Sequence, residues 1–89
     1  MIKLYKFYKN NCSPCYVLAR ILVVVDMPED VELVNINVEN EENKAFALKN
    51  EIEKVPVLMF EDGRKLILPK SKIEVINFLK GEDQNAISN

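Results

Sequence analysis

Apolar and polar positions follow patterns that predict alternating strands and helices. Residues 2–8 combine β-forming Ile, Tyr and Phe with adjacent apolar side chains at Leu4 and Tyr5, as in a strand covered on both faces. A helix is predicted over residues 12–25, apolar almost all round, with Arg20 as its one charge. Such a helix is either buried on two sides or leaves apolar surface exposed, and we expect it to belong to the core. A second strand is predicted over residues 31–38.

The middle of the chain predicts a helix followed by a hairpin. The helix would cover residues 41–50 and bury Ala45 and Leu48, with Phe46 as a further candidate for the buried face. An Asp-Gly pair at positions 62 and 63 is the strongest short hairpin signal in the chain. It predicts antiparallel strands over residues 57–61 and 64–68.

A capping box predicts the last helix. Ser71 and Glu74 have the spacing in which each side chain satisfies backbone groups at a helix start, so we expect a helix over residues 72–80. Its inner face would carry Ile73, Ile76 and Leu79.

The element order is then β-α-β-α-β-β-α. A strand, a helical crossover and a second strand predict a parallel pair with right-handed connection. With the hairpin added, the pattern predicts an α/β fold whose four-stranded mixed sheet is flanked by three helices. No repeat, linker or second domain is evident, so we expect one domain over residues 1–81 and a polar tail over residues 82–89.

Composition narrows the classes of function. The 89 residues are 48% hydrophobic and 29% charged, which is ordinary for one small soluble globular domain. The net charge of −2 without a basic block does not favour nucleic acid as a partner. The absence of histidine removes the usual general base and the commonest metal ligand. The longest apolar stretch is too short to span a bilayer, and no signal peptide is visible after Met1, so we expect a cytoplasmic protein.

The only two cysteines, Cys12 and Cys15, form a C-S-P-C motif between the first strand and helix. Positions i and i+3 lie on one helix face, and a helix N-terminus favours a thiolate over a thiol. A structural zinc site needs four Cys or His ligands, so this chain would need a dimer to form one. Inert core thiols are the other alternative. In this context, the motif predicts thiol–disulfide redox chemistry.

With C-S-P-C after the first strand, Val55-Pro56 before the third and Asp-Gly in the hairpin, the chain resembles the thioredoxin/glutaredoxin superfamily over roughly residues 2–79. The resemblance implies a thioredoxin fold with an exposed nucleophile at Cys12 and a resolving Cys15. It also implies a cis bond before Pro56, across from the cysteines, with the Val55 backbone pairing with bound substrate. The substrate-binding positions expected by resemblance are Ser13, Pro14, Val55 and Pro56.

Two branches of this superfamily remain open. The length and Lys9, three residues before Cys12, are similar to glutaredoxins, in which a lysine there helps to hold glutathione. The motif itself is nearer to the C-G-P-C of thioredoxins. The Gly-Gly pair that many glutaredoxins place after the last strand is replaced by Leu68-Pro69.

Two positions that thioredoxins use beside the motif differ here. Asn11 stands in place of a tryptophan, and Lys6 stands in place of the buried acid six residues before the first cysteine. Solvent, or Lys6 if it faces inward, would then have to take the Cys15 proton. The alternative for Lys6 is a lysine at the sheet margin. Tyr8 and Tyr16 either line a substrate groove or are ordinary core or rim aromatics.

We therefore expect a thioredoxin-like protein-disulfide reductase of glutaredoxin size. The resemblance implies no bound cofactor, a redox disulfide recycled by a thioredoxin-reductase-type enzyme or glutathione, and a monomer without membrane partners. By analogy, ribonucleotide reductase is a candidate among its protein disulfide substrates. The alternatives are a glutathione-dependent glutaredoxin and a non-catalytic interaction module, which would need the surface of the fold rather than both cysteines.

Overall fold

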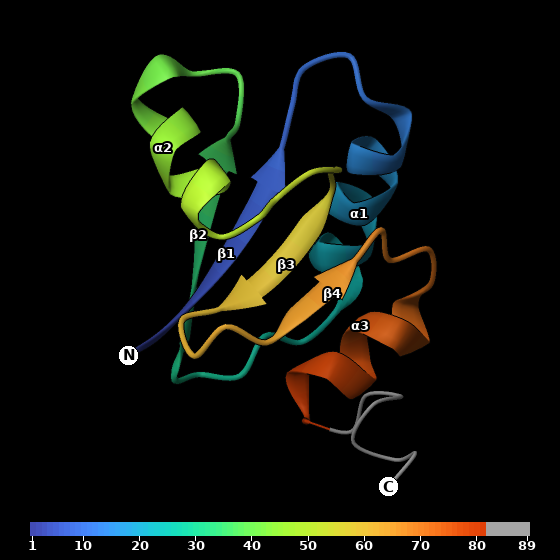
Figure 1. Cartoon of the computed structure of the whole chain (residues 1–89). Coiled ribbons are helices and arrows are strands. Elements are labelled where there is room, and N and C mark those ends of the chain that lie inside the picture. The colour runs from blue at the N-terminus through green and yellow to red at the C-terminus, as the bar shows by residue number, and fades with distance from the viewer. Residues whose placement is uncertain (82–89) are drawn as a thin grey trace, which may run out of the picture.

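The computed structural model describes residues 1–81, and the predicted tail over residues 82–89 lies outside them. The predicted element order is confirmed, and each predicted boundary that differs does so by one residue. The elements are β1 (Ile2–Tyr8), α1 (Ser13–Val24), β2 (Val31–Asn37), α2 (Glu41–Lys49), β3 (Val57–Phe60), β4 (Lys65–Ile67) and α3 (Lys72–Leu79) (Figure 1).

The four strands form one mixed sheet in the order β2-β1-β3-β4. β1 runs parallel to β2, with Leu4 opposite Leu33, and α1 is the crossover between them. β3 is antiparallel to β1, with Leu4 opposite Phe60, and β4 is antiparallel to β3. The expected hairpin and the parallel pair are therefore both present.

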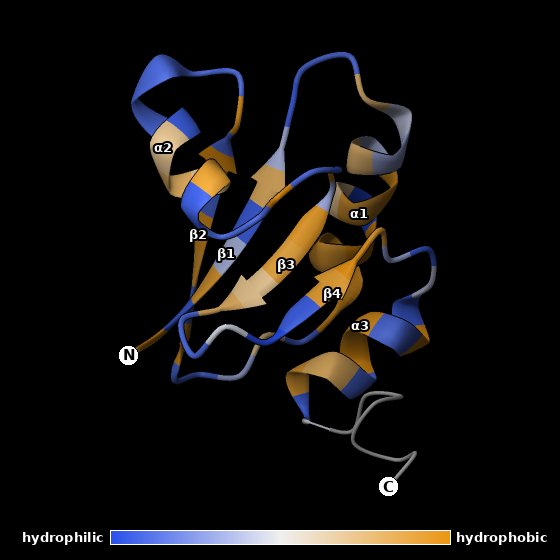
Figure 2. Ribbon diagram, viewed as in Figure 1, coloured by the Kyte–Doolittle hydropathy of each residue, from blue (hydrophilic) through white to orange (hydrophobic). Residues whose placement is uncertain are grey.

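Each face of the sheet is covered by helices, as Figure 1 shows. Because strand side chains alternate between faces, Leu4 and Leu58 point to one side, where they share a cluster with Leu18 of α1 and Phe78 of α3. On the other face, Phe7, Val57 and Met59 cluster with Ala47 of α2. The central strand β3 is correspondingly apolar along its whole length, while β1 mixes apolar and polar residues (Figure 2). Two separate cores result, one on each side of the sheet.

The expectation that the apolar helix α1 belongs to the core is correct for one face only, and the alternative of exposed apolar surface describes the other. Leu18 is completely buried, but Val23 is 83% exposed and Val24 is 61% exposed. The sheet covers one face of α1, and the opposite face stays in contact with solvent. No helix within residues 1–81 has the length and apolar character needed to cross a membrane.

The inner faces of the two other helices also differ from those predicted. Ala47 faces the sheet in α2 and the candidate Phe46 packs partly buried beside it, while Ala45 and Leu48 are exposed. In α3, Val75 and Phe78 are completely buried, the predicted Ile76 and Leu79 pack partly buried against the same core, and the predicted Ile73 is 60% exposed. The reason in α3 is size: the Phe78 ring packs on Phe60, with ring centroids 5.2 Å apart, and this contact sets which face turns inward.

The capping box at the start of α3 is confirmed. The Ser71 hydroxyl accepts the Glu74 N–H at 3.3 Å. The Glu74 carboxylate accepts the Lys70 N–H at 3.0 Å, one residue earlier than in the usual reciprocal pair. Both bonds fix the point at which α3 begins.

Candidate active site

The two cysteines lie at the first turn of α1 and are joined by a disulfide, with Cα atoms 5.2 Å apart. Cys12 is the N-cap, and its sulfur accepts the Cys15 N–H at 3.2 Å. Pro14 lies in the first turn, where its missing N–H removes no helical hydrogen bond. The start of the helix therefore both positions the Cys12 sulfur and directs an N–H dipole at it.

Both sulfurs are shielded in the disulfide form. Cys12 is 3% exposed and Cys15 is 5% exposed. The expectation of an exposed Cys12 is therefore wrong for this form, because the side chain folds back over the first helical turn to act as its cap. The neighbouring Ser13 and Pro14 are exposed, so a partner approaching the disulfide meets them first.

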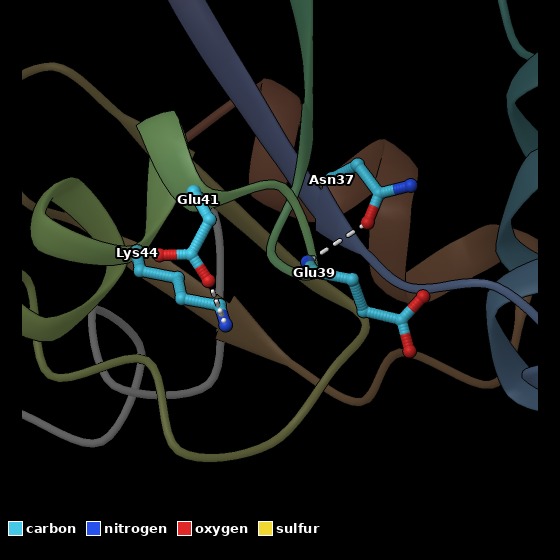
Figure 3. A network of polar contacts seen from close by, with 4 residues as sticks. All are labelled: Asn37, Glu39, Glu41 and Lys44. Atoms are coloured by element: carbon cyan, nitrogen blue, oxygen red, sulfur yellow. Dashed lines mark hydrogen bonds and ion pairs between the residues drawn. The ribbon is translucent and has the colours of Figure 1, made fainter.

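Hydrogen bonds join the loop that leads into Cys12 to residues at the C-terminal end of β2. Asn11 has φ of 52°, a left-handed conformation that asparagine tolerates better than most residues. The Asn10 N–H donates to the Glu39 carboxylate, and the Asn37 amide donates to the Asn10 side chain, both at 3.2 Å. The Glu39 N–H in turn donates to the Asn37 side chain at 2.9 Å (Figure 3).

This Asn10–Asn37–Glu39 network was not predicted from the sequence. Its only local signal is polar residues where β1 and β2 end. Figure 3 also shows the exposed ion pair of Lys44 with Glu41, which lies on α2 and belongs to that helix rather than to the dithiol.

The Val55–Pro56 peptide bond is cis, as the resemblance implied. Pro56 is buried, and its carbonyl accepts the Leu68 N–H at 2.9 Å. Val55 is half-buried and packs against the Phe7 cluster. In residues 1–81, the Val55 N–H and C=O make no hydrogen bond to another backbone group.

One cleft of about 450 Å³ brings several of these segments together. It contains three of the predicted site residues, Lys9, Pro14 and Val55. The cleft is thus formed by three segments: the turn that holds the cysteines, the loop before the cis proline and the residue after β4. The complete lining is Lys9, Pro14, Val38, Ile52, Glu53, Lys54, Val55 and Leu68.

Five residues of this lining were not predicted as part of a site, and one of them, Glu53, is a charged residue of the exposed loop before the cis proline. Val38 and Ile52 follow a strand and a helix, and sequence alone indicates only that they are apolar anchors. Lys54 carries no distinguishing signal. Leu68 has φ of 52°, a conformation that favours glycine, so nothing in its residue type indicates this turn.

Lys6, Tyr8 and Tyr16 lie outside the lining of the cleft. Tyr16 is 55% exposed on α1. The Lys6 ammonium lies 5.3 Å from the centre of the Tyr8 ring, and both side chains are half-buried. Burial lowers the pKa of Lys6 below its ordinary value of 10.5.

Solved structures with the same fold are found at low sequence identity. Trxlp from Edwardsiella tarda EIB202 superimposes with a TM-score of 0.74 and 20% identity, over 88% of this chain and 81% of its own. A mutant thioredoxin from Halobacterium salinarum NRC-1 gives 0.73 and 22%, over 93% and 75% of the two chains. A malarial protein gives 0.69 and 14%, over 92% and 97%.

Comparison by sequence gives no further relatives. No protein-family model matches the chain, and no curated protein matches it. The structural neighbours share the order of strands and helices described above, so the expected fold class is confirmed. This chain has the thioredoxin fold, with a C-x-x-C cysteine pair at the start of its first helix.

Proposed function

We propose that this protein is a thiol–disulfide oxidoreductase that reduces protein disulfides. The observation that supports this best is the Cys12–Cys15 disulfide at the N-terminus of α1, beside a cleft walled by Pro14 and Val55. The fold of the structural neighbours makes this chemistry plausible but does not identify a substrate.

The reaction begins with the reduced protein. The thiolate of Cys12, favoured by the N–H groups at the helix start, attacks one sulfur of a substrate disulfide. A bond forms between Cys12 and that sulfur while the substrate S–S bond breaks. The second substrate sulfur leaves with the electron pair and takes a proton from water.

Cys15 completes the exchange. Its thiol loses a proton to solvent, and the resulting thiolate attacks the Cys12 sulfur of the mixed disulfide. The Cys12–Cys15 bond forms, the remaining substrate sulfur leaves as a thiolate, and water protonates it. Two electrons have then passed from the dithiol to the substrate, and the protein is left in the disulfide form described above.

The cleft accounts for how a substrate segment would be held. Val55 offers a backbone N–H and C=O that no other described backbone group uses, so an extended segment can pair with them. The apolar wall formed by Ile52, Val55 and Leu68 suits side chains next to the substrate cysteine. The recycling partner that we propose is a thioredoxin-reductase-type enzyme, with ribonucleotide reductase as a candidate substrate and the cytoplasm as the compartment.

One observation favours a second candidate, a glutathione-dependent glutaredoxin. Lys9 and Lys54 both line the cleft and outnumber its one acidic residue, Glu53, so two ammonium groups are available to the carboxylates of a small thiol. The substitution of Gly-Gly by Leu68-Pro69 is the contrary feature, since side chains now occupy the end of β4.

A recycling experiment tests the proposal and separates the candidates. The oxidised protein is incubated with NADPH and thioredoxin reductase, or with NADPH, glutathione and glutathione reductase, and its free thiols are counted. We expect two thiols to return with thioredoxin reductase and a protein disulfide substrate then to be reduced. Return only with glutathione would favour the second candidate. Cys12→Ser is the control and must show no turnover in either system.

A further inference from the structure

Lys6 is the one charged strand side chain on the sheet face that α1 covers, within residues 1–81. Strand alternation places Lys6 on the same face as Leu4 and Tyr8, and its cross-strand neighbours are Asn35 on β2 and Leu58 on β3. Leu4 and Leu58 belong to the core cluster beneath α1 and α3. An ammonium group in this position lies on the side of the sheet that carries the dithiol helix.

The topology places Lys6 and Cys15 toward the same end of the sheet and on the same face of it. Because β1 and β2 are parallel, α1 begins near the end of β1 and runs back along it. Leu18 of α1 shares a cluster with Leu4. Cys15 lies about one helical turn before Leu18, roughly 5 Å, and Lys6 lies two strand residues after Leu4, roughly 6.6 Å in the same direction. Both displacements, along α1 and along β1, lead toward the end of the sheet at which α1 begins.

The position of the ammonium group agrees with this placement. Lys6 Nζ lies 5.3 Å from the centre of the ring of Tyr8, so the ammonium group lies beside the last residue of β1, at the end of the strand where α1 begins. Cys15 is on the buried face of α1, the same face as Leu18.

Among residues 1–81, Lys6 has no anionic partner in the disulfide form. The ion pairs found within residues 1–81 join Lys44 to Glu41 and Arg64 to Asp62. The groups that face Lys6 from β1, β2 and β3 are Tyr8, Asn35 and Leu58, none of them a carboxylate. α1 contributes one charged side chain, an arginine, and it is exposed. A half-buried cation without a counter-charge is unfavourable, and burial accordingly lowers the Lys6 pKa.

We propose that Lys6 is the electrostatic partner of Cys15, and that its ammonium group stabilises the Cys15 thiolate once the disulfide is opened. The inference rests on the proposed function and adds a positioning charge to its second step. Lys6 keeps its proton throughout: Cys15 loses its own proton to solvent, attacks the Cys12 sulfur, and the substrate sulfur leaves with the electron pair. Because only the reduced forms contain the thiolate, Lys6 also shifts the dithiol–disulfide equilibrium toward reduction.

The test isolates Cys15 in a Cys12→Ser background, where its thiolate is titrated by ultraviolet absorbance. We expect Lys6→Met to raise the Cys15 pKa by about 1, a roughly tenfold change in the ionisation constant, since a neighbouring cation favours the charged form of an acid by this order of magnitude. Lys6→Arg keeps the charge and should leave the pKa near that of the parent. Lys3→Met is the matched control, because Lys3 lies exposed on the same strand but on the opposite face. No rise with Lys6→Met, or an equal rise with Lys3→Met, would overturn the inference.

A second measurement uses the intact dithiol, equilibrated with a glutathione redox buffer. Lys6→Met should increase the fraction of protein in the disulfide form at a fixed buffer ratio, and Lys6→Arg should not. Circular dichroism confirms that each variant is folded. If the Cys15 pKa responds as expected but the protein reduces no disulfide, the proposed function fails and the electrostatic pair stands. If disulfides are reduced but the pKa does not respond, only the pair fails.

Discussion

The backbone N–H of Cys15 donates to the sulfur of Cys12 at 3.2 Å, so the first turn of α1 directs a positive dipole at the atom proposed to attack. The same contact makes Cys12 the cap of the helix. Chemistry at this sulfur and the start of the helix are therefore coupled.

This contact predicts a reactive Cys12. In Cys15→Ser, the rate of Cys12 alkylation should follow a pKa below the free-cysteine value of about 8.5, because the helix N-terminus stabilises the thiolate. The pH profile of iodoacetamide labelling measures it. A profile that rises only around or above 8.5 would mean that shielding of the sulfur outweighs the helix dipole.

The unequal burial of α1 predicts unequal sensitivity to truncation along one helix. Leu18→Ala removes a completely buried side chain from the cluster with Leu4 and should lower the free energy of unfolding by about 2–5 kcal/mol. Val23→Ala, at a position 83% exposed, should change it by less than about 0.5 kcal/mol. Urea unfolding of both variants measures the difference, and similar losses would contradict the one-sided packing of α1.

The position of Lys6 predicts a pH dependence of stability in the oxidised protein. Folding lowers the Lys6 pKa, so between that lowered pKa and the ordinary value of 10.5 the unfolded chain binds more protons than the folded one. On account of Lys6, the free energy of unfolding therefore rises as pH increases through this window.

The measurement is a series of unfolding curves from neutral to alkaline pH for the parent and for Lys6→Met. The stability of the parent minus that of Lys6→Met should increase with pH, since the variant lacks the titrating group. A difference that stays constant or decreases would show that the ammonium of Lys6 is not desolvated in the folded protein.

Local signals account for most of what the sequence predicted correctly. Ser71 with Glu74 marks the start of α3 through contacts within four residues, and an Asp-Gly pair does the same for the β3–β4 hairpin. The C-S-P-C motif also contains the residue that caps α1 and the proline of its first turn. Such features form wherever their neighbours in sequence allow, so no tertiary information is needed to find them.

Tertiary packing decided the features that were missed. A helix such as α1, apolar on every side, has no periodicity to indicate that Leu18 faces the sheet while Val23 faces solvent. The cleft combines segments more than fifty residues apart, from Lys9 to Leu68. The hydrogen bond between the Asn10 and Asn37 side chains depends on the pairing of β1 with β2. Residue types alone do not encode these relationships.

The central claim is that Cys12 attacks substrate and Cys15 resolves the mixed disulfide. The most direct measurement incubates Cys15→Ser with a protein disulfide substrate and examines the products by non-reducing electrophoresis and mass spectrometry. We predict a stable adduct joined through Cys12, which releases both proteins on reduction, and no adduct with Cys12→Ser. An adduct formed equally by Cys12→Ser, or none with Cys15→Ser although the parent reduces the substrate, would contradict these roles.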